Sequence, residues 1–260
     1  WHHFAVTLEA TSATTGTKEI YIDGVLQQSC SYSSKNSVVG THELNIGRRS
    51  ISGSPAEHFN GLLDELRISS SVRYTADFTP ATAAYSSDSN TKLLIHSNTT
   101  MGSTTFTDSG ATTHTITASG NVKHIAPKMG KGMGVWYGSS SKISTPDHPA
   151  WSHFGDGQGN FTIEGWLYMN SSPTNTGEQA LFCQETSTSN MFMASINGTT
   201  RAVTVKMNNN SVISAPAGIA EITQYTDTAA VTGDEEETTW AITYAAGGFT
   251  VGYQWSEQDL

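Results

Sequence analysis

Basic side chains are scarce in this chain. Its 260 residues include 13 Lys and Arg against 23 Asp and Glu, which gives a formal net charge of −10 at pH 7. Neutralising phosphates requires a basic face, so the composition argues against nucleic acid as a partner. Charged residues make up 14% of the chain and hydrophobic residues 36%. This balance is unlike that of a disordered chain and indicates a globular protein with a real core.

Long apolar runs and cysteines are also lacking. No run of roughly 18 or more apolar residues occurs, so the sequence predicts no transmembrane helix. The two cysteines, Cys30 and Cys183, match no metal-ligand spacing and form no disulfide framework, which favours two free thiols over a disulfide. The chain begins at Trp1 in a strand-like run without a signal peptide, and we expect it to be a piece of a longer polypeptide.

Turn-forming and hydroxyl residues are abundant instead, with 32 Ser, 36 Thr and 24 Gly. Short runs of alternating polarity are separated by Gly, Asn and Ser, and a helical period of apolar residues does not persist anywhere. The pair Asp23-Gly24 lies between two such runs and predicts a tight hairpin. These patterns predict an all-β chain, arranged as a two-sheet antiparallel sandwich.

Composition divides the chain into four segments. Residues 1–80 contain a series of short strands, and residues 81–91 are small and polar, which is typical of a linker. Strand patterns resume over 92–213. The final segment, 214–260, contains an acidic run and a separate β-hairpin.

Several motifs in the first segment resemble the C-terminal half of laminin G-like and concanavalin A-like lectin/glucanase jelly-roll domains. The first is the Trp-His-His run that opens the chain, and another is the "FNGLLDELRI" strand. The matching stretches are Trp1 to Thr7, Tyr21 to Gly24, Ile46 and Gly47, Phe59 to Ile68, and Arg73 to Pro80.

Motifs in the third segment resemble the N-terminal half of the same domains. They stand at Leu93 to His96, Phe106 to Gly110, Val135 to Ser139, and Phe161 to Trp166. The two halves are therefore in inverted order. Either they assemble into one permuted jelly roll, which we favour because a half sandwich would expose an apolar face, or they are fragments of a tandem array. In the permuted form, residues 1–8 and 201–214 are expected to be neighbouring antiparallel strands.

The resemblance implies a calcium site. In the family, an Asp at each of two matching positions often lies near a bound Ca²⁺, and those positions are Asp64 and Asp108 here. Carboxylates and turn carbonyls are the oxygen ligands that Ca²⁺ prefers. The alternative is that Asp108 only organises its turn and that Asp64 pairs with Arg67 or Arg73.

The sequence predicts no enzyme. Asp64 and Glu65 are neighbours on one strand, so their side chains point to opposite faces and cannot act as a carboxylate pair. Glucanases of this fold carry acids at alternating strand positions, whereas the strand at "TIEGW" offers Glu164 alone. The nine His residues also lack the spacing of a zinc site.

Ligand contacts are predicted in the loop from Pro146 to Asn160. Trp151 lies there among turn-forming residues, with His153 and Asp156 close by. An aromatic ring flanked by hydrogen-bonding groups suits the apolar face of a sugar. The three residues are therefore the predicted ligand-binding residues.

The family implies a lectin-like binding or adhesion module, displayed outside the cell, on a cell surface or on a virion, with a glycan or glycoconjugate as partner. A purely structural fibre, decoration or spacer protein, with neighbouring copies as partners, is the alternative. A second alternative, an outer-membrane porin-like component, rests on the tail alone, where aromatic residues alternate with small ones over residues 238–255 in a way that resembles a bacterial porin hairpin. An edge hairpin packed on the sandwich explains that pattern equally well.

Overall fold

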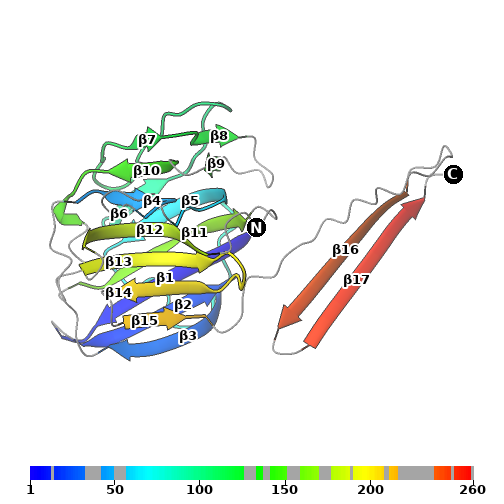
Figure 1. Ribbon diagram of the computed structural model, residues 1–260. Coiled ribbons are helices and arrows are strands. Elements are labelled where there is room, and N and C mark those ends of the chain that lie inside the picture. Colours follow the sequence, from blue (N-terminus) through cyan, green and yellow to red (C-terminus); the bar gives the residue numbers. More distant parts are fainter. Residues whose placement is uncertain are drawn as a thin grey trace.

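The computed structural model contains two stacked antiparallel β-sheets (Figure 1). It describes residues 1–12, 15–32, 42–49, 57–125, 133–136, 141–150, 159–169, 177–187, 190–207, 211–215, 237–246 and 249–258. Within these residues, no helix is long and apolar enough to cross a membrane. The predicted all-β sandwich is confirmed.

One sheet has eight strands. Its order is β3 (Val25–Tyr32), β2 (Gly16–Ile22), β1 (His2–Ala10), β11 (Phe161–Met169), β5 (Gly61–Ser69), β9 (Met133–Trp136) and β8 (Lys123–Ile125), and β6 (Thr91–Ile95) pairs with the second half of β5.

The other sheet has seven strands. Its order is β15 (Ser211–Ser214), β14 (Val203–Met207), β13 (Asn190–Asn197), β12 (Glu178–Ser187), β4 (Leu44–Ile46), β10 (Lys142–Thr145) and β7 (Thr117–Ser119). Both sheets run in the same direction in Figure 1, from β7 and β8 at one end to β15 and β3 at the other.

Strands of the two half-motifs interleave in both sheets. The first-half strand β1 pairs with the second-half strand β11 from His2↔Leu167 to Leu8↔Phe161. In the other sheet, β4 of the first half lies between β12 and β10 of the second. The inverted halves therefore form one sandwich, as expected.

One expected strand pairing is wrong. Residues 201–214 do not pair with β1, whose neighbours are β2 and β11. They contain β14 and β15, which lie in the opposite sheet next to β13. The strands β12, β13, β14 and β15 follow one another closely in the chain, each pairs with the next, and both edges of β14 are already taken.

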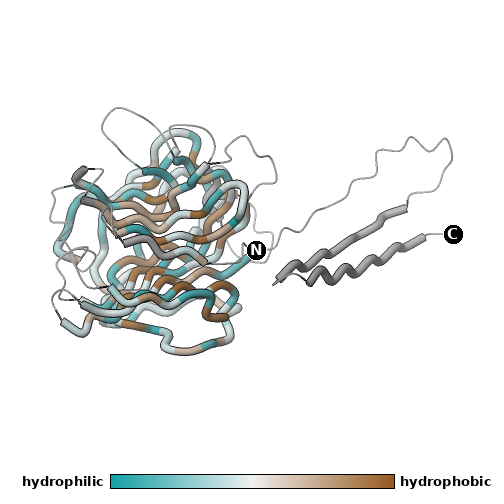
Figure 2. Tube along the Cα trace, turned by 60° about the horizontal axis from the view of Figure 1, so that its bottom comes forward, coloured by the Kyte–Doolittle hydropathy of each residue, from teal (hydrophilic) through white to brown (hydrophobic). Residues whose placement is uncertain are grey.

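Alternation along the strands builds the core between the sheets. On β1, Phe4, Val6 and Leu8 point inward and are at most 1% exposed, while the intervening residues face outward. The inward side chains of β11 and β13 meet there, for example where the rings of Phe161 and Phe192 lie edge to face at 5.2 Å. Hydrophobic segments recur along the strands of both layers in Figure 2.

The predicted Asp23-Gly24 turn joins β2 to β3. Asp23 has a φ of 51° and Gly24 a φ of 81°, as a two-residue type I′ turn requires. A Cβ on Gly24 would come within 1.8 Å of the Phe78 carbonyl oxygen, and the Phe78 amide donates to the Gly24 carbonyl at 2.8 Å. The turn therefore also anchors the crossing segment, residues 70–90, on the outer face of the eight-stranded sheet.

Residues 237–258 form a sheet of their own. The strand β16 (Glu237–Ala246) pairs with β17 (Phe249–Gln258) in a continuous register, with Trp240 opposite Trp255 and Ile242 opposite Tyr253. The predicted terminal hairpin is present, and the porin interpretation of it stays a prediction.

Candidate functional site

An open groove lies on the outer face of the seven-stranded sheet, at the end formed by β4, β10 and β7. The register places Ile143 opposite Ile46 and Ala118, and these residues face the core. The alternate positions face outward, where Ser144 lies between Asn45 and Thr117. Three short strands with apolar inner and polar outer positions thus build a polar floor on a packed core.

The groove has a volume of about 540 Å³. The described residues that line it are all polar except one, and they are His42, Glu43, Thr117, Ser119, Lys142, Ser144, Pro146 and Asp147. The Lys142 ammonium pairs with the Glu43 carboxylate and donates to the Asn45 amide oxygen at 2.8 Å. This ion pair leaves the groove rich in hydrogen-bonding groups with little net charge.

Side-chain contacts hold the rim of the groove at Asp147. The Gln184 amide on β12 donates to the Asp147 carboxylate at 3.2 Å and to the His42 carbonyl oxygen at 3.3 Å. The next residue, His148, packs edge to face on His114 with a centroid distance of 4.6 Å and accepts a hydrogen bond from the Ala150 amide at 3.1 Å. The loop that begins at Pro146 is therefore fixed at its start on the groove.

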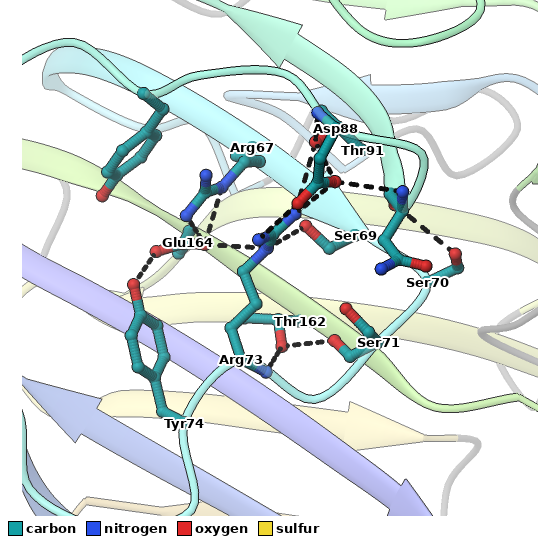
Figure 3. Close-up of polar contacts among 12 residues, drawn as sticks. Arg67, Ser69, Ser70, Ser71, Arg73, Tyr74, Asp88, Thr91, Thr162 and Glu164 are labelled. Atoms are coloured by element: carbon teal, nitrogen blue, oxygen red, sulfur yellow. Dashed lines mark hydrogen bonds and ion pairs between the residues drawn. The ribbon is translucent and has the colours of Figure 1, made fainter.

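A second polar cluster lies on the outer face of the eight-stranded sheet, under the crossing segment (Figure 3). Glu164 on β11 is fully buried and binds the Arg67 guanidinium of β5 at 2.7 Å. It also accepts a hydrogen bond at 2.6 Å from the hydroxyl of Tyr74, which comes from the crossing segment. His3 Nε2 lies 3.5 Å from the same carboxylate and 2.8 Å from the Tyr85 hydroxyl.

Electrostatics fix the charge of this cluster. Burial by itself would raise the pKa of Glu164, but His3, Arg67 and Tyr74 outweigh it, so the pKa lies below its ordinary value. A second carboxylate, Glu65, is also fully buried and is bound by His96 and by the Tyr85 amide. Because both carboxylates are enclosed and bonded, the cluster fastens the crossing segment to the sheet.

The first half of the chain contributes two sequence motifs to the antiparallel sandwich. The "WHHFAVT" motif lies on β1, and the "GLLDELRI" motif lies on β5. Residues 1–79 match the family model of the concanavalin A-like lectin/glucanases superfamily. The expected resemblance is confirmed over this range. Comparisons with curated proteins and with solved structures found no match for the chain.

In this sandwich, the predicted calcium ligands have separate roles. Asp108 organises a turn, because its carboxylate accepts hydrogen bonds from the amides of Leu94, Gly110 and His114 at 2.8–3.0 Å. Asp64 lies buried on β5 and accepts from the Glu65 amide at 2.8 Å.

In the part of the chain that the structure describes, no group of three or more His, Cys, Asp or Glu side chains could hold a metal. Calcium binding by Asp64 and Asp108 stays a prediction. Arg67 and Arg73, the alternative partners of Asp64, bind Glu164 and Asp88.

The predicted ligand contacts Trp151, His153 and Asp156 lie outside the described residues, so the structure does not place their side chains. Their loop nevertheless begins at Pro146 and Asp147, which line the groove. Sequence reasoning missed the groove itself, because its floor comes from three strands that are distant in the chain. The only available signal was the outward polar residue in each short strand, as in "LNI" and "KIST".

Proposed function

We propose that this chain is a lectin-like binding module that holds a glycan or glycoconjugate in the groove formed by β4, β10 and β7. The groove is the observation that carries the proposal. Its volume of about 540 Å³ falls within the range of ligand sites, roughly 300–1,000 Å³. The superfamily match over residues 1–79 supports the same class of function without fixing the ligand.

The chemistry of the lining favours a hydroxyl-rich ligand of low charge. Hydroxyl groups on Thr117, Ser119 and Ser144 can both donate and accept hydrogen bonds, as sugar hydroxyls do. Lys142 and Glu43 neutralise each other, and the remaining carboxylate in the lining, Asp147, disfavours an anionic ligand. A neutral sugar therefore fits this lining better than a phosphate.

An aromatic platform completes the proposed site. Sugars pack an apolar face on aromatic rings, and the loop that starts at the groove contains Trp151. Trp151, with His153 and Asp156, is therefore proposed as the contact that comes from the loop. A module of this kind is suited to display on a cell or virion surface, where it would mediate attachment.

A glycan array with the purified chain tests the proposal. We expect saturable binding that free sugar competes away. Thr117→Trp, which fills the groove from an exposed position of β7, should abolish this binding, whereas Ser31→Trp on the exposed edge strand β3 should preserve it. Silence across a broad panel would contradict the lectin function and favour a structural spacer.

The variant Trp151→Ala tests whether Trp151 contacts the ligand or packs in the core. Truncating a buried Trp costs roughly 3–5 kcal/mol of stability. We expect unchanged unfolding curves together with weaker glycan binding. A loss of stability of that size would show that Trp151 belongs to the core, and unchanged binding would remove it from the site.

A further inference from the structure

A buried lysine lies at the β3 edge of the eight-stranded sheet. Lys18, on β2, is 1% exposed, and its ammonium nitrogen lies 6.0 Å from the centre of the Tyr32 ring on β3. Ile20, two residues further along the strand, belongs to the main core. Lys18 therefore lies on the core side of β2, an unusual position for a lysine.

Cys30 lies directly opposite Lys18 on the neighbouring strand. The register pairs Lys18 with Cys30, and the Cβ atoms of directly opposed residues are about 4.5–5.5 Å apart. Cys30 is a free thiol that packs against the main core, as a half-buried residue on the edge strand β3. The Cys30 thiol donates to the Ser31 carbonyl oxygen at 3.2 Å, and the register places the Lys18 side chain next to that of Cys30, at a half-buried position of the sheet edge that small solutes can reach.

The surroundings favour reaction between these two groups. Burial lowers the pKa of the Lys18 amine, although the neighbouring Cys30 partly opposes this effect. A larger share of the amine is then neutral, with the lone pair that a nucleophile needs. The other cysteine, Cys183, is fully buried among Ala180, Met191 and Met193 on β12 and β13, so it is shielded from solutes.

We propose that Lys18 and Cys30 form an oxidation-dependent cross-link site that responds to hydroperoxides. In the first step, the Cys30 thiol attacks the peroxide, which gives a sulfenic acid and one water. In the second, the Lys18 amine attacks the sulfur, hydroxide leaves with a proton from nitrogen as a second water, and an S–N bond forms. The peroxide is reduced, the sulfur is oxidised by two electrons, and the protein loses two hydrogens.

The cross-link would join two neighbouring strands at the edge of the sandwich. Thiols reverse it, because two thiol equivalents return the amine and the Cys30 thiol and leave as a disulfide. The site is independent of the glycan groove, which lies at the other end of the other sheet.

Peptide mapping of the full chain after treatment with hydrogen peroxide tests the proposal. Trypsin cleaves after free Lys, so the cross-link should abolish cleavage after Lys18 and give one peptide, residues 1–35, that is two hydrogens lighter than the same peptide without the cross-link. Reduction with dithiothreitol should restore cleavage. A Cys30–Cys183 disulfide would instead join residues 19–35 to residues 143–201, and the experiment is repeated on Cys183→Ala, where the cross-linked peptide 1–35 should persist.

Lys18→Arg is the matched variant, since it keeps the charge and the long side chain but replaces the amine by a poorly nucleophilic guanidinium. Its Cys30 sulfenic acid should persist and be trapped by a 1,3-dione reagent several-fold more than in the unsubstituted chain. Equal trapping in both proteins, an unreactive Cys30, or normal cleavage after Lys18 in oxidised protein would each overturn the proposal. The cleavage readout uses the unsubstituted chain, so it holds even if Lys18→Arg folds poorly.

Discussion

Glu164 is the side chain on which the buried polar contacts of the outer face converge. Its carboxylate binds Arg67, Tyr74 and His3, and it is fully buried. Removing one partner of a buried ion pair leaves an uncompensated charge, which costs about 3–5 kcal/mol. Glu164→Gln, which keeps the size but removes the charge, should therefore lower the free energy of unfolding in urea by about that amount.

Asp88 provides the matched control. Its carboxylate pairs with Arg73 at 3.0 Å, and this hydrogen bond holds its pKa well below the usual range. However, the Asp88 side chain is 47% exposed, so solvent screens the pair. Asp88→Asn should cost less than about 1 kcal/mol. Equal losses for the two variants would show that burial does not set the strength of these pairs.

The β2–β3 hairpin depends on a glycine for two independent reasons. Gly24 has a positive φ, and the Phe78 carbonyl oxygen occupies the space of a Cβ. Gly24→Ala should therefore cost more than about 1 kcal/mol, since the strain of the turn adds to a displaced crossing segment. Gly102→Ala is the comparison, because Gly102 also has a positive φ but open space around it. Chemical unfolding should show the larger loss for Gly24→Ala.

The contact between His114 and His148 makes the groove loop sensitive to pH. Burial lowers the pKa of His114 below 6.5, the neighbouring His148 lowers it further, and Asp108 partly opposes both. The unfolded chain then takes up a proton at a higher pH than the folded chain. The contribution of neutral His114 to the free energy of unfolding is therefore fully present above pH 6.5. It falls as the pH decreases through that value toward the pKa of His114 in the folded chain.

Urea unfolding at about pH 7.5 and about pH 5.5 measures this effect. We expect lower stability at the acidic value, with a smaller difference in His114→Gln. An unchanged difference in the variant would assign the pH dependence to other groups.

Calcium binding would act on the whole molecule, because a bound ion stabilises the folded chain against unfolding. A ligand that binds only the folded state stabilises it by about 2.7 kcal/mol at a hundredfold excess over its dissociation constant. If Asp64 and Asp108 take part in a calcium site, millimolar Ca²⁺ should raise the melting temperature relative to EDTA, and Asp64→Asn should abolish the rise. Superimposable melting curves would contradict the site and leave Asp108 as the organiser of its turn.

Local patterns were sufficient to predict the strands, the hairpin turn and the resemblance of residues 1–79 to a known superfamily. Alternation over "HHFAVTLEA" and the Asp23-Gly24 pair act between residues close in the chain, so they can be recognised without a partner strand. The motif order also indicated that the two halves complete each other. The wrong pairing of residues 201–214 with β1 shows the limit of this reasoning, because which sheet a strand joins depends on its neighbours.

Residues 81–91 show what sequence pattern cannot reveal. They are small and polar as a linker would be, yet Tyr85 among them is 6% exposed and bonds to His3 and to Glu65. The polar composition of a segment therefore does not predict whether its side chains are buried. Their burial depends on the sheet surface on which the segment packs.

Sequence by itself thus determined the strands, their inward and outward faces and the family of the first half, because these follow from neighbouring residues. Only the tertiary structure decided which polar side chains share a site. Ser144 and Thr117 meet in one groove, and Lys18 faces Cys30 across two strands, because strand register brings together residues that the chain keeps apart.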